Sequence, residues 1–234
     1  MTRDFAPYDR RGYQVLSVTD GYSAWSELYD EQLDGNLDIA LLERIQGVEW
    51  SRVTAAADLG CGTGRIGQWL RQRGVSQIDG VDLTGSMLAQ ARDKGAYRSL
   101  REEDACATSL LASHYDLIVS CMAIGHMPSL DRAFGEMNRL LAPGGHAVLV
   151  AFHPFFLLSG IPTHFKDRSG TNRAIQNYVH LMSDHFAAAQ QLGWQLLELL
   201  ERVVDDQWVA MAPGYQRHVG KPVTFAMVWQ GPGS

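Results

Sequence analysis

Apolar positions recur at two spacings along the chain and divide it into predicted strands and helices. Short apolar runs typical of buried strands occur at 53–58, 77–82, 115–122, 144–152 and 222–230, with a weaker run at 97–102. Helical spacing lies between them, near 64–73, after Thr84 as the expected N-cap, and over 129–141 between Ser129 and Pro143. This alternation predicts a parallel sheet with helices on both faces.

The segments outside this alternation are less regular. Residues 1–19 mix charges and have few periodic apolar positions, so we expect a loosely held arm. Helical spacing over 20–46 predicts two helices that cover one side of the sheet. Residues 153–177 contain aromatic side chains and histidines without clear periodicity, which predicts an irregular functional insertion. A helix is expected at 178–192, whereas 194–204 fits either a strand or a helix.

Composition and charge narrow the classes of protein. Hydrophobic residues are 46% of the 234 residues and charged residues 20%, which is enough for a sizeable core in one domain. The net charge of −6 argues against a nucleic-acid partner, because such proteins normally present a basic patch. No run of apolar residues is long enough to cross a membrane, and the first residues lack the apolar core of a secretory signal. The absence of such a run means that we expect no membrane partner. The three cysteines form no CxxC pair, so we expect a reduced, cytoplasmic protein.

The segment from Asp58 to Gly64, DLGCGTG, carries the most specific signal. It follows an apolar strand and precedes a helix, where glycines permit a sharp turn and the close approach of a ligand. Asp82 ends the next strand, 22 residues beyond Gly60, a spacing that suits a carboxylate binding both hydroxyls of a ribose. Asp104 follows the third strand, so the three carboxyl ends are expected to line one crevice.

The ligand of this crevice is ambiguous from the glycine pattern alone. Residues 62–67 match the GxGxxG pattern of dinucleotide-binding proteins. Asp58 directly before the glycines suits an ammonium group better than a pyrophosphate, and Asp104 with Ala105 offers an acceptor for an adenine amino group. A final strand after a long last crossover also favours a nucleoside ligand other than a dinucleotide.

The successive motifs DLGCGTG at 58–64, VDLT at 81–84, EDA at 103–105, YDLIVS at 115–120 and LLAPGG at 140–145 resemble those of class I S-adenosylmethionine-dependent methyltransferases. The resemblance covers 53–152 in order and is specific as a set. It implies an α/β fold, a Rossmann-like three-layer sandwich with a seven-stranded, mostly parallel sheet of order 3-2-1-4-5-7-6 whose last strand is antiparallel. It also implies one domain over 1–234: a helical cap (1–50), the cofactor-binding core (53–152), an acceptor lid and helix (153–193) and the final strands (194–230).

The same resemblance implies roles for individual residues in binding S-adenosylmethionine and its product S-adenosylhomocysteine. The loop, with Asp58 and Cys61, passes beneath the methionine part of the cofactor at Gly60, Gly62 and Gly64. Asp82 holds the ribose, and Leu83 and Met87 lie against the adenine, whose edge meets Asp104 and Ala105. The backbone near Ser120 and Cys121 meets the amino group, and Tyr29 closes over the cofactor.

Histidines are the candidates for a catalytic base, because imidazole titrates near neutral pH. His153 directly follows the fifth strand and is expected to face the crevice, which makes it the first candidate. His126 follows the fourth strand and is the second, with the alternative that it only packs beneath the next helix. His153, His164, His180 and His185 could together bind a metal, but their spacing matches no known ligand pattern, so no metal site is expected.

The sequence therefore predicts an enzyme that transfers a methyl group from S-adenosylmethionine to oxygen or nitrogen of a small-molecule acceptor. The aromatic insertion predicts a partly apolar or aromatic acceptor, which it would cover as a lid. Two alternatives stay open: a catalytically silent cofactor-binding partner protein, and an oxidoreductase that uses NAD. The sequence leaves the oligomeric state undetermined.

Overall fold

The computed structural model describes residues 2–33 and 37–233, and its centre is a seven-stranded sheet of order β4-β3-β2-β5-β6-β10-β9. Numbered along the chain within this sheet, the order is the predicted 3-2-1-4-5-7-6. The strand β10 is antiparallel to both of its neighbours, and the other pairs are parallel. The strands are β2 (Ala55–Leu59), β3 (Gln77–Asp82), β4 (Ser99–Glu102), β5 (Tyr115–Cys121), β6 (Leu141–Phe152), β9 (Gln195–Val203) and β10 (Pro222–Gln230).

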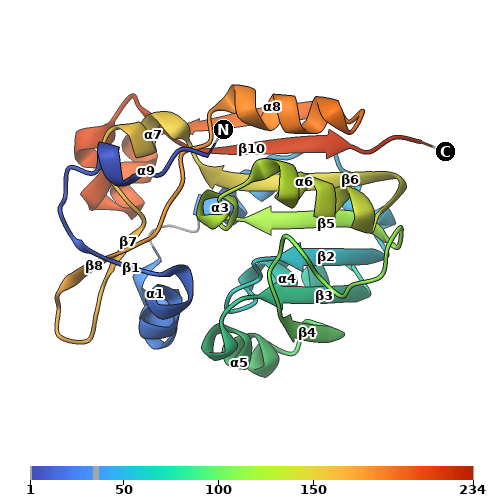
Figure 1. Ribbon diagram of the computed structural model, residues 1–234, viewed down its shortest axis with the longest axis horizontal. Coiled ribbons are helices and arrows are strands. Elements are labelled where there is room, and N and C mark those ends of the chain that lie inside the picture. The colour runs from blue at the N-terminus through green and yellow to red at the C-terminus, as the bar shows by residue number, and fades with distance from the viewer. Residues whose placement is uncertain (1, 34–36, 234) are drawn as a thin grey trace.

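Helices cover both faces of this sheet and make the predicted three layers (Figure 1). On one face, α6 (Leu130–Leu140) and α8 (Met182–Gln191) pack on β5, β6 and β10. On the other, α3 (Leu37–Leu42) and α4 (Arg65–Gln72) enclose a second core, with α5 (Gly85–Lys94) beside β3 and β4. Every residue of β2 is buried, because this central strand has a layer of helices on each side.

Local signals in the sequence place most of these helices. The Ser129 hydroxyl caps α6 by accepting from the Arg132 amide at 3.3 Å, as predicted. Thr84 occupies the N-cap position of α5, but its hydroxyl makes no capping bond. The ambiguous segment after Trp194 is a strand, β9, whose side chains alternate between exposed and half-buried.

The N-terminal segment is not the loosely held arm that the sequence predicts. Its strand β1 (Gln14–Leu16) pairs with β8 (Asn172–Ile175), which pairs with β7 (His164–Lys166), and the three form a small second sheet. The expected irregular insertion therefore contains β7, β8 and the short helix α7 (Pro154–Leu158). The predicted helix at 178–192 begins later, at Met182.

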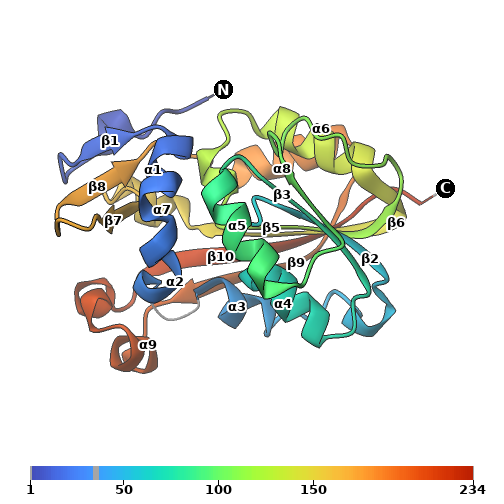
Figure 2. The ribbon, with the colours of Figure 1, turned by 90° about the horizontal axis from the view of Figure 1, so that it is seen from below.

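The remaining helices join this second sheet to the main one. Figure 2 shows α1 (Val18–Trp25) between the small sheet and α5, with α2 (Tyr29–Gln32) at its end. The helix α9 (Asp206–Met211) lies beside β9 at the end of the sheet. Residues 34–36, within the helical stretch predicted over 20–46, lie outside the described residues. In the described chain, no helix has the length and apolar character needed to cross a membrane.

Candidate functional site

A cavity of about 220 Å³ opens where β2, β3 and β5 reach their carboxyl ends. Ten of the predicted site residues line it: Tyr29, Gly60, Gly62, Asp82, Leu83, Met87, Asp104, Ala105, Cys121 and His126. Five others do not: Asp58, Cys61, Gly64, Ser120 and His153. The sheet thus brings the motifs after its first four strands, in chain order, to one crevice, as parallel strand topology requires.

The glycine loop lies against neighbouring side chains at close range. Gly60 has φ of +79°, and a Cβ there would lie 2.4 Å from the Cβ of Ala123. Gly62 has φ of +51°, and a Cβ added there would lie 3.3 Å from Cε of Met87. Glycine therefore fits this position, where a side chain would crowd Met87. Gly64 instead faces α5, where a Cβ would lie 3.0 Å from that of Ala91. Its role is therefore in helix packing, which differs from the predicted contact with a cofactor.

Asp82 is held by the turn that it faces. One carboxylate oxygen accepts from the Gly62 amide at 2.9 Å, and the other accepts from the Thr84 amide at 2.9 Å. Burial raises the pKa of Asp82, and these two amides oppose that shift. Each oxygen keeps a second lone pair, so the side chain can accept two further hydrogen bonds from a ligand in the cavity.

Asp58 lies beneath the loop, outside the cavity lining, and is fully buried. Tyr97 donates its hydroxyl to one carboxylate oxygen at 2.7 Å, while the other oxygen, Oδ1, has no hydrogen-bond partner. Desolvation raises the pKa of Asp58 to about 7. A buried acceptor without a partner is costly in a folded protein, and this one lies under the segment predicted to meet an ammonium group.

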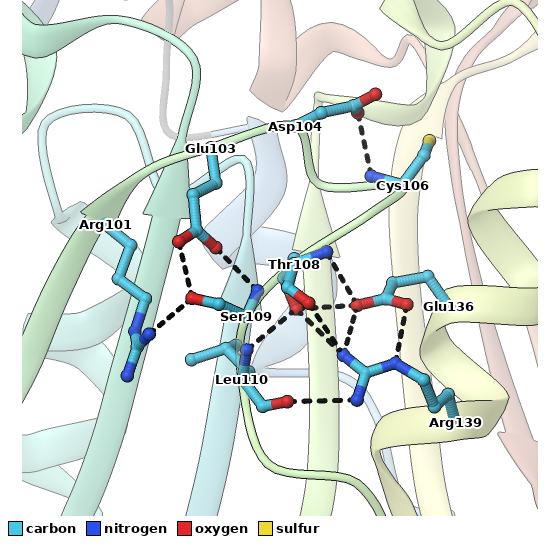
Figure 3. A network of polar contacts seen from close by, with 9 residues as sticks. All are labelled: Arg101, Glu103, Asp104, Cys106, Thr108, Ser109, Leu110, Glu136 and Arg139. Carbon is cyan, nitrogen blue, oxygen red and sulfur yellow. Dashed lines mark hydrogen bonds and ion pairs between the residues drawn. The ribbon is translucent and has the colours of Figure 1, made fainter.

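A network of polar contacts holds the loop on which Asp104 lies beside the cavity (Figure 3). Glu136 of α6 accepts from both the amide and the hydroxyl of Thr108, at 2.9 and 2.6 Å. Arg139 of the same helix pairs with Glu136 and donates to the carbonyls of Thr108 and Leu110, each at 3.0 Å. Because α6 packs in the core, this network gives the loop a rigid support.

A second cavity of about 530 Å³ adjoins the first. Its lining combines polar residues such as Glu31 and Lys166 with a group of aromatic side chains from α1, α2, the end of β6, the insertion and the C-terminal part: Tyr22, Trp25, Tyr29, Phe152, Phe156, His164, Phe165 and Tyr215. A buried ion pair between Asp38 and Arg65 adds a polar wall. Among the described residues, Tyr22, Tyr29 and Met122 are common to both cavities and mark their junction.

His126 and Tyr22 meet at this junction. Nδ1 of His126 lies 2.7 Å from the Gln176 carbonyl, which can only accept, so Nδ1 carries the proton. Nε2 is therefore the acceptor for the Tyr22 hydroxyl, at 2.9 Å. Burial lowers the pKa of His126 and raises that of Tyr22, so both groups are neutral near neutral pH. The pair is an oriented donor and acceptor in which Tyr22 borders both cavities and His126 borders the first.

The expectation that His153 faces the crevice is wrong. Its ring is directed to the far part of the sheet, where Nε2 lies 2.8 Å from Oε1 of Glu201 on β9. Its Nδ1 accepts from the Phe155 amide and caps α7, and its own amide donates to Val223. Of the described residues, those that line the three cavities do not include His153. Of the two candidate histidines, His126 lines the crevice and His153 does not.

Sequence reasoning missed three residues of the site. Tyr22 precedes Trp25 by three positions and Tyr29 by seven, so helical periodicity contained the signal that places it on their face. Tyr97 anchors Asp58 from the loop before β4, at a position that no motif indicates. Met122 adopts φ of +59°, which no local sequence signal predicts for a methionine.

Comparisons with known proteins agree with this geometry. Residues 57–149 match the family model described as a methyltransferase domain. The malonyl-[acyl-carrier protein] O-methyltransferase of Pectobacterium atrosepticum is 31% identical over 179 residues, which are 76% of this chain and 65% of that protein. The chain thus spans slightly less than two thirds of this relative's length.

Solved structures share the fold at lower identity. An S-adenosylmethionine-dependent methyltransferase from Mesorhizobium loti superimposes with a TM-score of 0.67 at 21% identity, covering 82% of this chain and 96% of that one. The [4+2]-cyclase SpnF superimposes with a TM-score of 0.64 at 18% identity, covering 95% and 100%. The matches favour the methyltransferase interpretation over the NAD alternative. The chain is therefore similar to class I S-adenosylmethionine-dependent methyltransferases in its motifs, its fold and its matched relatives.

Proposed function

We propose that the protein transfers a methyl group from S-adenosylmethionine to an oxygen or nitrogen atom of a small-molecule acceptor. The first cavity would hold the cofactor, with Asp82 binding the ribose and Leu83 and Met87 beside the adenine. Asp104 would accept from the adenine amino group. When bound, the cofactor supplies an electrophilic methyl group on a positively charged sulfur.

The residues present suit this cofactor. The unpartnered Oδ1 of Asp58 offers a buried acceptor beneath the glycine loop, which a ligand ammonium group in the cavity could reach through a bridging water. Gly60 and Gly62 line the cavity and carry no side chain, so a ligand can lie close to their backbone. Asp82 keeps lone pairs that could accept hydrogen bonds from two ribose hydroxyls.

The second cavity would hold the acceptor. Its volume of about 530 Å³ is within the range of small-molecule sites. Aromatic walls favour an apolar or aromatic acceptor, and the insertion that supplies several of them would act as its lid. Several similar proteins are malonyl-[acyl-carrier protein] O-methyltransferases, which supports oxygen as the accepting atom.

The hydrogen bond between Tyr22 and His126 is the observation that carries the proposed chemistry. The Tyr22 hydroxyl can pass its proton to Nε2 of His126 and take the proton of an acceptor hydroxyl, so that the acceptor becomes the stronger nucleophile. The Gln176 carbonyl holds the ring in the tautomer that this transfer requires. Methyl transfer also demands alignment, which two adjoining cavities can impose.

Substitution of His126 tests this assignment. We expect His126→Ala to lower turnover by roughly 10²–10⁴ and to leave the dissociation constant of S-adenosylhomocysteine within a few-fold. Turnover of the wild type should fall as the pH drops through the lowered pKa of His126, because the protonated ring cannot accept. Release of S-adenosylhomocysteine from a panel of hydroxyl, carboxyl and amino acceptors measures both effects.

His153→Ala is the matched control, because that histidine lies outside the cavities and should leave turnover unchanged. Equal turnover in His126→Ala and the wild type would remove His126 from the mechanism. Tight cofactor binding by a wild type that methylates no acceptor of the panel would instead favour the silent binding protein.

A further inference from the structure

Met122 differs from the other residues at the junction in the cavities that it borders and in its backbone conformation. It borders both large cavities and also a third one of about 20 Å³ behind it, and it is the one described residue that borders all three. It follows β5 with φ of +59°, a left-handed conformation that is costly for a side chain with a Cβ. Strained residues of this kind persist where the surrounding structure imposes them, often at functional sites.

The contacts around Met122 explain how the conformation is imposed. Its amide donates to the Val150 carbonyl of β6 at 2.7 Å, which holds the backbone at the end of the sheet. The next residue, Ala123, lies where a Cβ on Gly60 would have come within 2.4 Å. Four residues beyond Met122, His126 reaches Tyr22. The left-handed turn therefore connects the sheet, the glycine loop and the Tyr22–His126 pair.

Of the three side chains at the junction, Met122 is partly buried and packs against the second core, whereas the two tyrosines are held by polar and aromatic contacts. The Tyr22 hydroxyl is bonded to His126, and the Tyr29 ring packs against Trp25 with centroids 4.7 Å apart. The thioether of Met122 is apolar and flexible, and it can fill an irregular gap. The third cavity behind it has room for about one water molecule, so a methionine side chain cannot withdraw into it.

We propose that Met122 is a specificity-determining residue: its side chain limits the size of the group that can occupy the passage between the cofactor cavity and the acceptor cavity. This inference rests on the proposed function, because it takes the sulfur of the cofactor to face the junction. Under the proposed function Asp82 and Asp104, which line the first cavity, would bind the nucleoside, and the junction side would be left for the sulfur. A sulfur substituent larger than methyl would then meet Met122.

Binding of sulfonium analogues tests this without knowledge of the acceptor. Calorimetry would compare S-adenosylmethionine with its S-propyl and S-benzyl analogues, which carry the same charge. The wild type should bind the larger analogues more weakly than the methyl compound. In Met122→Gly and Met122→Ala, the ratio of the benzyl to the methyl dissociation constant should fall about tenfold or more. Met122→Leu, of similar volume, should keep the wild-type ratio.

Leu83→Ala is the matched control, because Leu83 lines the same cavity beside the predicted adenine position. It should weaken all three compounds to a similar extent and leave the ratio unchanged. An unchanged ratio in both Met122→Gly and Met122→Ala, with normal binding of S-adenosylmethionine, would overturn the inference. A wild type that does not bind S-adenosylmethionine would contradict the proposed function itself, and the inference would fall with it.

Discussion

A single carboxylate organises the cofactor end of the site. Asp82 closes the glycine loop by accepting from Gly62, and it opens α5 by accepting from Thr84. It is mostly buried, so its charge acts in a low dielectric where hydrogen bonds are stronger. The same side chain thus holds the loop in shape and presents lone pairs to a ligand, and its loss should affect both.

We expect Asp82→Ala to weaken binding of S-adenosylhomocysteine by about ten- to hundredfold. Loss of hydrogen bonds to a charged group costs roughly 1.5–3 kcal/mol, which corresponds to that change in affinity. Isothermal titration calorimetry measures the dissociation constant directly. Asp116→Ala is a useful control, because this carboxylate also caps backbone amides, at Thr54 and Ala55, at the opposite end of β2. An unchanged constant in Asp82→Ala would show that the ribose does not bind there.

For single residues, the sequence could predict that Gly60, Gly62 and Asp82 lie at the crevice, because they follow strands whose carboxyl ends meet at one edge of a parallel sheet. It could not predict where the His153 ring points. A residue just after a strand can face either side of the sheet edge, and here the choice depends on Glu201, far along the chain on β9. Spacing carries no information about that partner.

Among the elements, the loop between β4 and β5 depends most on side-chain contacts. It contains no regular secondary structure between Glu102 and Tyr115, and its shape comes from bonds to Glu136 and Arg139 on α6. Glu136 has a side chain only 8% exposed, so the charge of Arg139 is needed to compensate it. Arg139 also lowers the pKa of Glu136.

Arg139→Met should therefore destabilise the fold and loosen the loop that presents Asp104. We expect a loss of about 2 kcal/mol in the free energy of unfolding, reduced from the cost of a fully buried pair because the Arg139 side chain is 38% exposed. Affinity for S-adenosylhomocysteine should fall several-fold. Urea denaturation and calorimetry measure the two effects.

The control is Arg52→Met, which breaks an ion pair with Glu49 of the same sequence spacing. Both of its side chains are mostly exposed, so little change in stability is expected. If the two variants lose equal stability, the network around Glu136 is not what holds the loop.

The central strands β2, β3, β5, β6 and β10 could be predicted from sequence because each is a largely buried apolar run, whereas the edge strand β9 stayed ambiguous because its side chains alternate between exposed and half-buried. The resemblance to a family supplied the strand order. The strands β7 and β8 could not, because they have three and four residues and too few positions for a period to show. Their partner, β1, lies near the start of the chain. Pairing between such distant short segments depends on tertiary packing, which local patterns do not report.

Over the whole molecule, the N-terminal segment and the insertion form one packed unit. Arg3 pairs with Asp184, and Phe5 packs against Leu157 and Val179 in a small separate cluster. The Phe5 amide also donates to the carbonyl of Asn177 at 3.1 Å. This unit supplies Tyr22 and much of the second cavity, so the site depends on contacts between the two ends of the chain.

Substitution of Phe5 should separate this unit from the sheet. Phe5 is 5% exposed, so Phe5→Ala removes a buried ring and should cost about 3 kcal/mol locally. Because small clusters can open without global unfolding, hydrogen exchange should accelerate over 154–179, while β2, β3 and β5 keep their protection. Val15→Ala, on β1 but 56% exposed, should change neither region. If hydrogen exchange accelerates uniformly in Phe5→Ala, the unit formed by the N-terminal segment and the insertion unfolds together with the sheet. Selective acceleration would instead give the acceptor side of the site a stability separate from that of the cofactor side, as a lid that admits substrate requires.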